Sequence, residues 1–232
     1  MLYVLRPTQN DIIHYGKGHD DSPPGRGSGR YAWGSGKKTS STLASRIYNN
    51  ARHEEPIITK NVKQAAEMAG SNMHGLEHRL KTKESIQRKI ETDSKEKNIS
   101  LQSAASDIKD AVRYTTISND DNFVSGYEKM KDLLGVIGYK EVRCKNYFQL
   151  YKEGKVKHKS VQSVFQDPNG YKFEIQFHTP SSQLAKDRKL PIYEERRKPG
   201  LSREQQIKLE KQMEDLAKQV TEPKNISRIK TH

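Results

Sequence analysis

The segment that most constrains this chain is residues 171–178, in which apolar and polar side chains alternate strictly. Its apolar positions are Phe173, Ile175 and Phe177, and its polar positions are Glu174, Gln176 and His178. A period of two predicts a half-buried β-strand whose aromatic and branched side chains pack into a core. We expect its other face to contact water. That face is either a plain solvated surface or a catalytic face with Glu174 at its centre.

A chain of 232 residues is long enough for one sizeable core with extensions, or for two small domains. Only 32% of the residues are hydrophobic and 31% are charged, so much of the length should lie outside a core. Forty-two Lys and Arg against 29 Asp and Glu give a net charge of +13. This excess suits a partner that carries phosphates, such as a nucleotide, RNA or DNA, although surplus lysine is also compatible with a solvated surface.

The single cysteine, Cys144, excludes an internal disulfide and fits a reducing compartment. No window approaches 18 apolar residues, and residues 1–5 are too short for the apolar part of a signal peptide. We therefore expect no membrane partner, and a location in a host cytoplasm or in a phage virion assembled there.

Residues 1–42 have the composition of a flexible, basic, disordered arm rather than of a domain. Seven of the 15 glycines lie between Gly16 and Gly36, among few aliphatic residues. Such a segment cannot offset the entropy of ordering by burial. The arm resembles the glycine-rich openings of proteins encoded in tailed-phage structural modules.

The middle of the chain predicts helices and strands in alternation. Residues 43–74 are a helical lead-in that Pro56 divides into two helices. Asn119 to Asn122 should cap a helix over residues 123–136. A strong hairpin turn at residues 167–170 joins the central strand to the one before it. The other expected elements are a short helix within residues 101–110 and strands at residues 111–117, 139–148 and 160–165.

Two helices and a tail follow the central strand. Ser181 should cap a helix through Ala185 that bends or ends before Pro191. Ser202 opens a capping box for a helix that reaches about Val220. The basic tail, residues 221–232, should be frayed.

Residues 79–89 gather cations near the start of a helix. Thr82 or Lys83 can open this helix, with Arg79 and Lys81 on the approach and Lys89 one turn beyond Ser85. Cations that converge at a helix N-terminus suit a polyphosphate. A basic, solvated helix face remains the alternative for this segment.

These two segments together resemble the RelA/SpoT-type nucleotidyltransferase (pyrophosphokinase) domain. Residues 79–89 look like that family's R-x-K-x-x-x-S-I-x-x-K segment, and residues 174–179 look like its E-x-Q-x-R-T strand. The chain is closer still to a variant branch in phage and polymorphic-toxin proteins, through residues 113–115, 173–181 and 193–196. The resemblance implies an α+β fold with a mixed, nucleotidyltransferase-like β-sheet core flanked by helices.

The resemblance also implies an activity, which is the transfer of the β,γ-pyrophosphate of ATP to a ribose hydroxyl of a nucleotide or a tRNA. Residues of the donor segment would bind ATP and Glu174 would bind Mg²⁺ or activate the hydroxyl, which Gln176 would orient. The expected nucleotide-binding set is Arg79, Lys81, Ser85, Lys89, Arg113 and His158. Phosphoryl-type transfer needs these parts: cations on the polyphosphate, a metal ion and an aligned hydroxyl.

Two positions depart from the family pattern. Ile108 occupies the place of the metal-binding Asp, so Asp110 or Asp107 would have to substitute for it. His158 occupies the place of the tyrosine that stacks on the acceptor base, and an imidazole stacks less well. The departures put the acceptor, and catalysis itself, in question.

The leading hypothesis is an ATP-dependent enzyme of this kind over residues 75–198, followed by a C-terminal helix and tail over residues 199–232. The second is a phage virion-associated protein whose fold is an inactive module that binds nucleic acid or capsid and portal proteins. A third is another nucleotide-using toxin, such as an ADP-ribosyltransferase, which would leave the basic segment unexplained.

Overall fold

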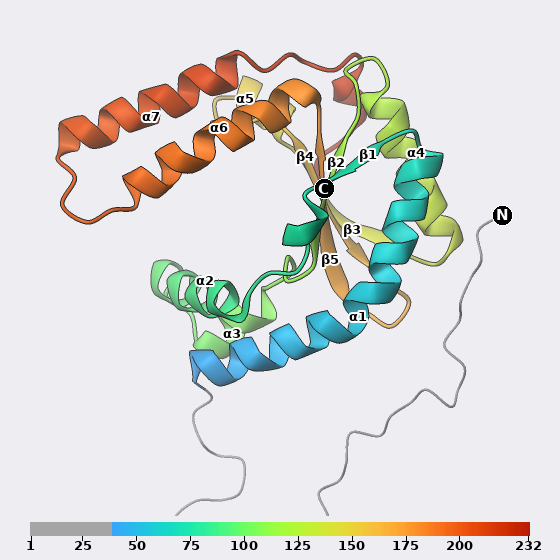
Figure 1. Cartoon of the computed structure of the whole chain (residues 1–232), viewed down its shortest axis with the longest axis horizontal. Helices are drawn as coiled ribbons and strands as arrows, with labels where there is room; N and C mark the ends of the chain where they lie inside the picture. The colour runs from blue at the N-terminus through green and yellow to red at the C-terminus, as the bar shows by residue number, and fades with distance from the viewer. Residues whose placement is uncertain (1–38) are drawn as a thin grey trace, which may run out of the picture.

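The computed structural model describes residues 39–232, where one five-stranded sheet carries helices on both faces (Figure 1). The strands are β1 Asn72–His74, β2 Arg113–Ile117, β3 Lys140–Asn146, β4 Val161–Gln166 and β5 Lys172–His178. Their order in the sheet is β1-β2-β5-β4-β3, with β2 parallel to β5 and the other neighbours antiparallel. The predicted α+β class with a mixed sheet is confirmed. The predicted arm, residues 1–42, lies almost entirely outside the described residues.

Seven α-helices surround this sheet within the described residues. They are α1 Ser40–Met68, α2 Lys83–Glu96, α3 Leu101–Ser106, α4 Phe123–Val136, α5 Tyr147–Lys152, α6 Pro180–Arg196 and α7 Arg203–Lys218. Two short 3-10 helices, η2 Leu76–His78 and η3 Ile226–Arg228, complete the set. From Thr39 to the C-terminus, none of these helices is both long enough and apolar enough to cross a membrane.

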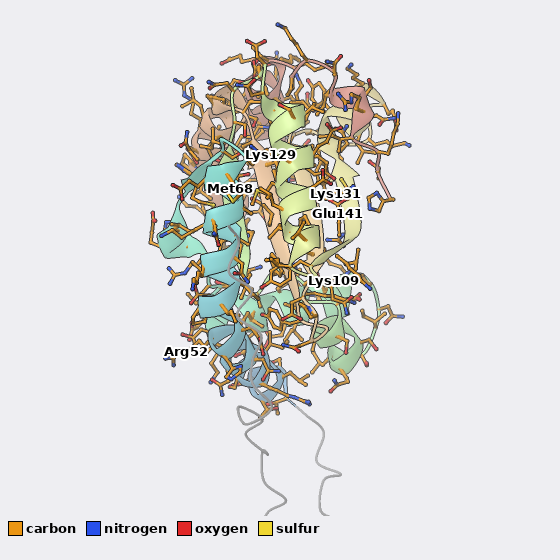
Figure 2. The ribbon with its side chains drawn as sticks, turned by 90° about the vertical axis from the view of Figure 1, so that its right-hand side faces the viewer. Arg52, Met68, Lys109, Lys129, Lys131 and Glu141 are labelled. Atoms are coloured by element: carbon orange, nitrogen blue, oxygen red, sulfur yellow. The ribbon has the colours of Figure 1, made fainter. Side chains whose placement is uncertain are left out.

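The hydrophobic core lies between one face of the sheet and helices α1 and α4, which Figure 2 shows side by side in front of the strands. The apolar residues of β5 point into this core, as their alternation predicts. The ring of Phe177 packs edge-on against Tyr127 of α4 at 5.0 Å, and Phe173 packs against Tyr114 of β2 at 6.1 Å. Burial of one such side chain stabilises a fold by roughly 1.5–3 kcal/mol.

The opposite face of the sheet is covered as well, so the prediction that it contacts water is wrong. Helix α6 starts at the end of β5 and projects away from the sheet with α7 packed beside it, while α2 and α3 pack against the N-terminal half of α1 (Figure 1). Glu174, Gln176 and His178 are only 7%, 6% and 4% exposed. The cover comes from α6, since Lys186 contacts Gln176 and Ser182 contacts His178. A helix that follows the strand in sequence thus buries a polar row that alternation alone assigns to the surface.

Pro56 does not divide the lead-in, which is the single helix α1. A proline inside a helix removes one backbone hydrogen bond and costs about 3 kcal/mol. Buried residues on both sides of it hold the two halves on the core: Ala51 and Glu55 before it, and Ile58 and Val62 after it. Tertiary packing therefore outweighs the local cost.

Pro191 does not end its helix either, because α6 continues to Arg196. Contacts on both sides of the proline hold it. Lys189 Nζ donates to the Lys157 carbonyl at 2.7 Å, and Arg196 pairs with Glu210 of α7 at 2.6 Å. The N-cap of α6 is Thr179 rather than Ser181, in a reciprocal capping box with Ser182.

The tail is not frayed, because residues 221–232 run back along the edge of the sheet. Ile226 and Ile229 are buried, and Asn146 Nδ2 donates to both of their carbonyls at 2.9 Å. His232 and Cys144 exchange two backbone hydrogen bonds of 2.9 and 3.0 Å beside β3. The end of the chain therefore belongs to the folded core.

Other local predictions hold with small shifts of boundary. Helix α4 spans the predicted residues, although Asn122 makes no side-chain cap hydrogen bond. The hairpin turn at residues 167–170 joins β4 to β5, with Gly170 at a φ of +91°. Helix α7 opens on the predicted capping box of Ser202 and Gln205. The strand expected at residues 139–148 is β3, which ends at Asn146, and the Asn146 side chain caps α5.

Candidate functional site

The site begins where the basic segment meets the start of β2. Leu80 pairs with Val112 in an isolated β-bridge, and Lys81 N donates to the Ala111 carbonyl at 2.9 Å. Helix α2 then starts, with Thr82 as its N-cap accepting from Ser85 N. This geometry brings the side chain of Lys81 beside Asp110.

Asp110 links the two lysines of the basic segment. Its Oδ2 lies 2.5 Å from Lys81 Nζ, and its Oδ1 lies 2.9 Å from Lys89 Nζ. Burial alone would raise the pKa of Asp110, but the two ammonium groups outweigh it and lower the pKa to about 2. Burial lowers the pKa of Lys81 despite its contact with Asp110. Asp110 is therefore an ionised carboxylate held between two cations.

Glu174 reaches the same hollow from β5. Its Oε1 accepts a hydrogen bond of 2.7 Å from Gln176 Nε2. The hollow has a volume of about 170 Å³, and Glu174 and Asp110 both line it. Its remaining lining residues are Lys89, Asp93, Lys97, Asp107, Lys109 and Arg143. We call it the acidic hollow, because four of its eight lining side chains are carboxylates.

A second hollow of about 320 Å³ adjoins the acidic hollow and shares Asp110 with it. Lys81, Ser85 and Arg113 contribute its polar wall, with Thr82 at the start of α2. Its other lining residues are Glu77, His78 and Leu80. We call it the donor hollow, because Lys81, Ser85 and Arg113 belong to the set that the sequence predicts to bind nucleotide.

A third and larger cavity, of about 400 Å³, lies between β5 and the α6–α7 pair and shares Arg113 with the donor hollow. Gln176, His158 and Lys186 line it, together with apolar side chains from α6 and α7. We call it the helix-covered cavity. Its further lining residues are Lys157, Lys159, Ser160, Gln162, His178, Ser182, Ala185, Lys189, Leu190, Tyr193, Arg196, Met213 and Val220.

His158 lies in the loop before β4 with its ring 4.2 Å from the ring of Tyr147, at an interplanar angle of 37°. Burial, together with the nearby Lys189 cation, lowers the pKa of His158 to about 4. The imidazole is therefore neutral at physiological pH. A neutral ring already held against an aromatic partner presents a flat surface to the cavity.

Arg79 is the one predicted site residue that lines none of the three hollows. Its guanidinium bonds to the Glu55 carboxylate of α1, and its Nη1 donates to the Leu76 carbonyl at 2.8 Å. The other predicted residues are brought together along one sheet face. They are Lys81, Ser85, Lys89, Asp110, Arg113, His158, Glu174 and Gln176.

Two residues of these hollows were missed in the sequence. Arg143 of β3 lies opposite Val164, which lies opposite Glu174, so all three share one face of the sheet. The alternation of β3 could have indicated this for Arg143. Lys186 carried no sequence signal, because its place over β5 depends on a helix that continues beyond residue 185.

The oxygen ligands suit magnesium better than a transition metal. Mg²⁺ is commonly bound by one or two carboxylates together with substrate phosphates, and Asp110 and Glu174 open onto one hollow. From Thr39 onward, no cluster of three or more His, Cys, Asp or Glu side chains could hold a metal ion by itself. A magnesium ion here would therefore need phosphate oxygens from the substrate.

No protein-family model and no curated protein matches this chain. Solved structures match it at low identity. Small alarmone synthetase 1 from Bacillus subtilis, bound to its product pppGpp, is 16% identical over 74% of this chain and 88% of its own, with a TM-score of 0.48. A GTP pyrophosphokinase family protein from Streptococcus pneumoniae is 16% identical over 75% and 85%, with a TM-score of 0.48.

The Type VI effector Tas1, solved with its immunity protein, is 17% identical over 76% of this chain and 96% of its own, with a TM-score of 0.46.

Proposed function

We propose that this protein transfers the β,γ-pyrophosphate of ATP to a ribose hydroxyl of a nucleotide or RNA. The observation that carries the proposal is the order of three adjoining hollows along one sheet face. Two carboxylates lie in the acidic hollow, cations line the donor hollow, and the helix-covered cavity adjoins it. Phosphoryl-type transfer requires little covalent work from a protein and depends on positioning and charge.

The donor hollow has the charges that a triphosphate needs. Lys81 lines the donor hollow and Lys89 lines the acidic hollow, and both pair with Asp110 between them. Arg113, which also lines the donor hollow, lies opposite Glu174 in the sheet. Arg143 adds a further cation to the acidic hollow. Charge-assisted hydrogen bonds from such groups are shorter and about twice as strong as neutral ones.

Asp110 would hold Mg²⁺ together with the phosphates of ATP, and Glu174 lines the same hollow, where it would be either a second ligand of the ion or the base for the hydroxyl. When bound, the ion would neutralise developing charge on the phosphate oxygens. The low pKa of Asp110 supports this role, because a carboxylate must be ionised to bind a metal. Lys81 and Lys89, which both pair with Asp110, would lie beside the phosphates and contact them.

The reaction exchanges one P–O bond for another. The ribose hydroxyl oxygen attacks the β-phosphorus, the bond from this phosphorus to the α,β-bridging oxygen breaks, and AMP leaves. Glu174 accepts the hydroxyl proton, and the Gln176 amide keeps the carboxylate in place through its bond to Oε1. The acceptor would occupy the helix-covered cavity, with its base near His158.

A catalytically inactive binding module is the second candidate, and one observation favours it. Two of the predicted ligand-binding groups are already paired inside the protein, Arg79 with Glu55 and Asp110 with two lysines. A module of this kind would bind nucleic acid or protein through its net positive charge without turnover.

The test is to incubate the full chain and Mg²⁺ with ATP labelled on its γ-phosphate and, separately, with GDP, GTP or bulk tRNA. The proposal predicts label on one acceptor, with one AMP released for each label transferred. Label on inorganic phosphate alone would indicate hydrolysis and contradict the proposed transfer. A protein that binds ATP–Mg²⁺ in calorimetry yet labels none of the three acceptors would favour the inactive module.

A further inference from the structure

Lys186 begins a chain of side-chain hydrogen bonds that crosses from the helix-covered cavity to the acidic hollow. Lys186 Nζ donates to Gln176 Oε1 at 2.8 Å, and Gln176 Nε2 donates to Glu174 Oε1 at 2.7 Å. Lys186 and Gln176 line the cavity, whereas Glu174 lines the acidic hollow. Gln176 therefore connects two separate hollows, and its amide is fixed at both ends.

The direction of this amide follows from the chemistry of its two neighbours. An ammonium group carries only donors, and an ionised carboxylate carries only acceptors. The amide oxygen must then face Lys186, and the amide nitrogen must face Glu174. In the reverse orientation the amide N–H groups of Gln176 would face the Lys186 ammonium, and the amide oxygen would face the Glu174 carboxylate, so neither contact would be a hydrogen bond. A charged group on each side thus selects one of the two amide orientations.

Lys186 differs from the surface lysines of this protein. Burial and the nearby Arg113 lower the pKa of Lys186 to about 8, although Asp187 and Glu174 act in the opposite direction. The neighbouring Asp187 carboxylate is engaged elsewhere, since its Oδ1 accepts from Gln183 Nε2 at 2.7 Å. Lys186 Nζ instead donates its hydrogen bond to the Gln176 oxygen. The Lys186 ammonium is thus held by a hydrogen bond to an amide rather than by an ion pair.

We propose that Lys186 is a positioning residue that holds the Gln176 amide with its nitrogen toward Glu174. The link to catalysis rests on the proposed function, whereas the orientation of the amide does not. With Oε1 of Glu174 occupied by the amide, the other oxygen is available to a metal ion or a hydroxyl proton. Since an ammonium has three N–H bonds, Lys186 can hold Gln176 and contact an anionic group in the cavity at once.

Loss of the ammonium should release the amide. Without a donor at Oε1, Gln176 can rotate or turn its oxygen toward Glu174, and the carboxylate then loses its hydrogen bond. Residues that orient the ligands of a reactive group typically change activity by about 10–100-fold when substituted. We expect this loss in kcat, with the KM for ATP nearly unchanged, because Lys186 does not line the donor hollow.

The experiment compares Lys186→Met with Lys186→Arg and with a matched control, Lys189→Met. Met keeps the aliphatic stem and removes the charge, while Arg restores a donor. Lys189 lies one turn further along α6, lines the same cavity and donates to a backbone carbonyl instead of to Gln176. Lys186→Leu serves as a second uncharged variant if the Met variant does not fold.

The readout is the pair of side-chain amide signals of Gln176 in nitrogen-15 NMR, assigned by their loss in Gln176→Glu. We expect distinct, slowly exchanging amide protons in the wild type, in Lys186→Arg and in Lys189→Met. In Lys186→Met they should move to the values of a solvent-exposed glutamine.

Two outcomes are distinguished. Unchanged Gln176 signals in folded Lys186→Met or Lys186→Leu would overturn the positioning role, whatever the transfer rates. Shifted signals in these variants support the role even if the wild type labels no acceptor, and that second result would count against the proposed function alone.

Discussion

Arg113 lies directly opposite Glu174 where β2 runs parallel to β5, so a cation and a carboxylate stand side by side on one face of the sheet. Arg113 also lines both the donor hollow and the helix-covered cavity. It is therefore the residue that a donor and an acceptor would share.

Arg113→Gln should weaken the binding of both substrates, whereas Lys89→Gln should weaken that of ATP alone, because Lys89 lies away from the cavity. Loss of one charge-assisted hydrogen bond costs about 1.5–3 kcal/mol, or roughly 10–100-fold in affinity. Calorimetry with ATP–Mg²⁺ and with the acceptor checks this for both variants. Equal effects of the two substitutions on acceptor binding would contradict the shared position of Arg113.

The ionised carboxylate of Asp110 should make the unfolding free energy fall as the pH is lowered into the acid range. Its pKa is lowered from 3.8 to about 2 in the folded protein. A carboxyl with a lowered pKa stabilises the fold above its unfolded pKa, and this stabilisation is lost as the pH falls toward 2. The shift corresponds to about 2 kcal/mol.

We therefore expect the unfolding free energy of the wild type to fall more steeply below about pH 4 than that of Asp110→Asn. Urea denaturation across this range measures the difference. Asp132→Asn, at an exposed position of α4, is the matched control and should keep the slope of the wild type. A wild-type slope in Asp110→Asn would show that the carboxyl is not held by its two lysines.

Variants of Arg79 and its partner Glu55 can separate the contribution of Arg79 to fold stability from its contribution to ATP binding. Arg79→Gln should lower the unfolding free energy by about 1–3 kcal/mol, because it leaves a buried carboxylate without its cation. The double variant Glu55→Gln/Arg79→Gln should recover part of this loss. If Arg79 also binds ATP, both variants that lack it should bind ATP more weakly, and Glu55→Gln should not. Full ATP affinity in the double variant would assign Arg79 a structural role only.

The C-terminal tail should contribute strongly to stability. Ile229→Ala removes a side chain that is 2% exposed and should cost about 2–5 kcal/mol. Lys230→Ala, at the adjacent exposed position, should change stability by less than about 0.5 kcal/mol. Thermal or urea unfolding distinguishes them. Similar values for both variants would mean that the tail is not docked in solution.

The sequence predicted those features that depend on neighbours along the chain. The alternation of β5 identified its core face, and the capping box at Ser202 identified the start of α7. Asp110 and Asp107 were the two candidates for the place of the family's metal-binding Asp. Asp110 pairs with Lys81 and Lys89, whereas Asp107 only lines the acidic hollow.

The errors concern contacts between distant segments. Pro56 and Pro191 were predicted to interrupt their helices, because a proline removes one backbone hydrogen bond. Tertiary contacts on both sides of each proline instead keep α1 and α6 continuous. The polar face of β5 was expected in water because nothing within the strand indicates that α6 covers it. Ile226 and Ile229, spaced for one helical turn, were a signal for the docked tail that its basic composition obscured.

The most direct measurement is label transfer by wild type and Glu174→Gln under the same conditions, with ATP–Mg²⁺ binding measured on both proteins. The substitution keeps the shape of the side chain and removes its charge and its capacity to accept the hydroxyl proton. We predict that transfer falls by at least about 10²–10³, the scale of losing one preorganised electrostatic group. Glu67→Gln, on the exposed side of α1, should transfer at the wild-type rate. A wild type that labels an acceptor together with an equally active Glu174→Gln would contradict the assignment of Glu174.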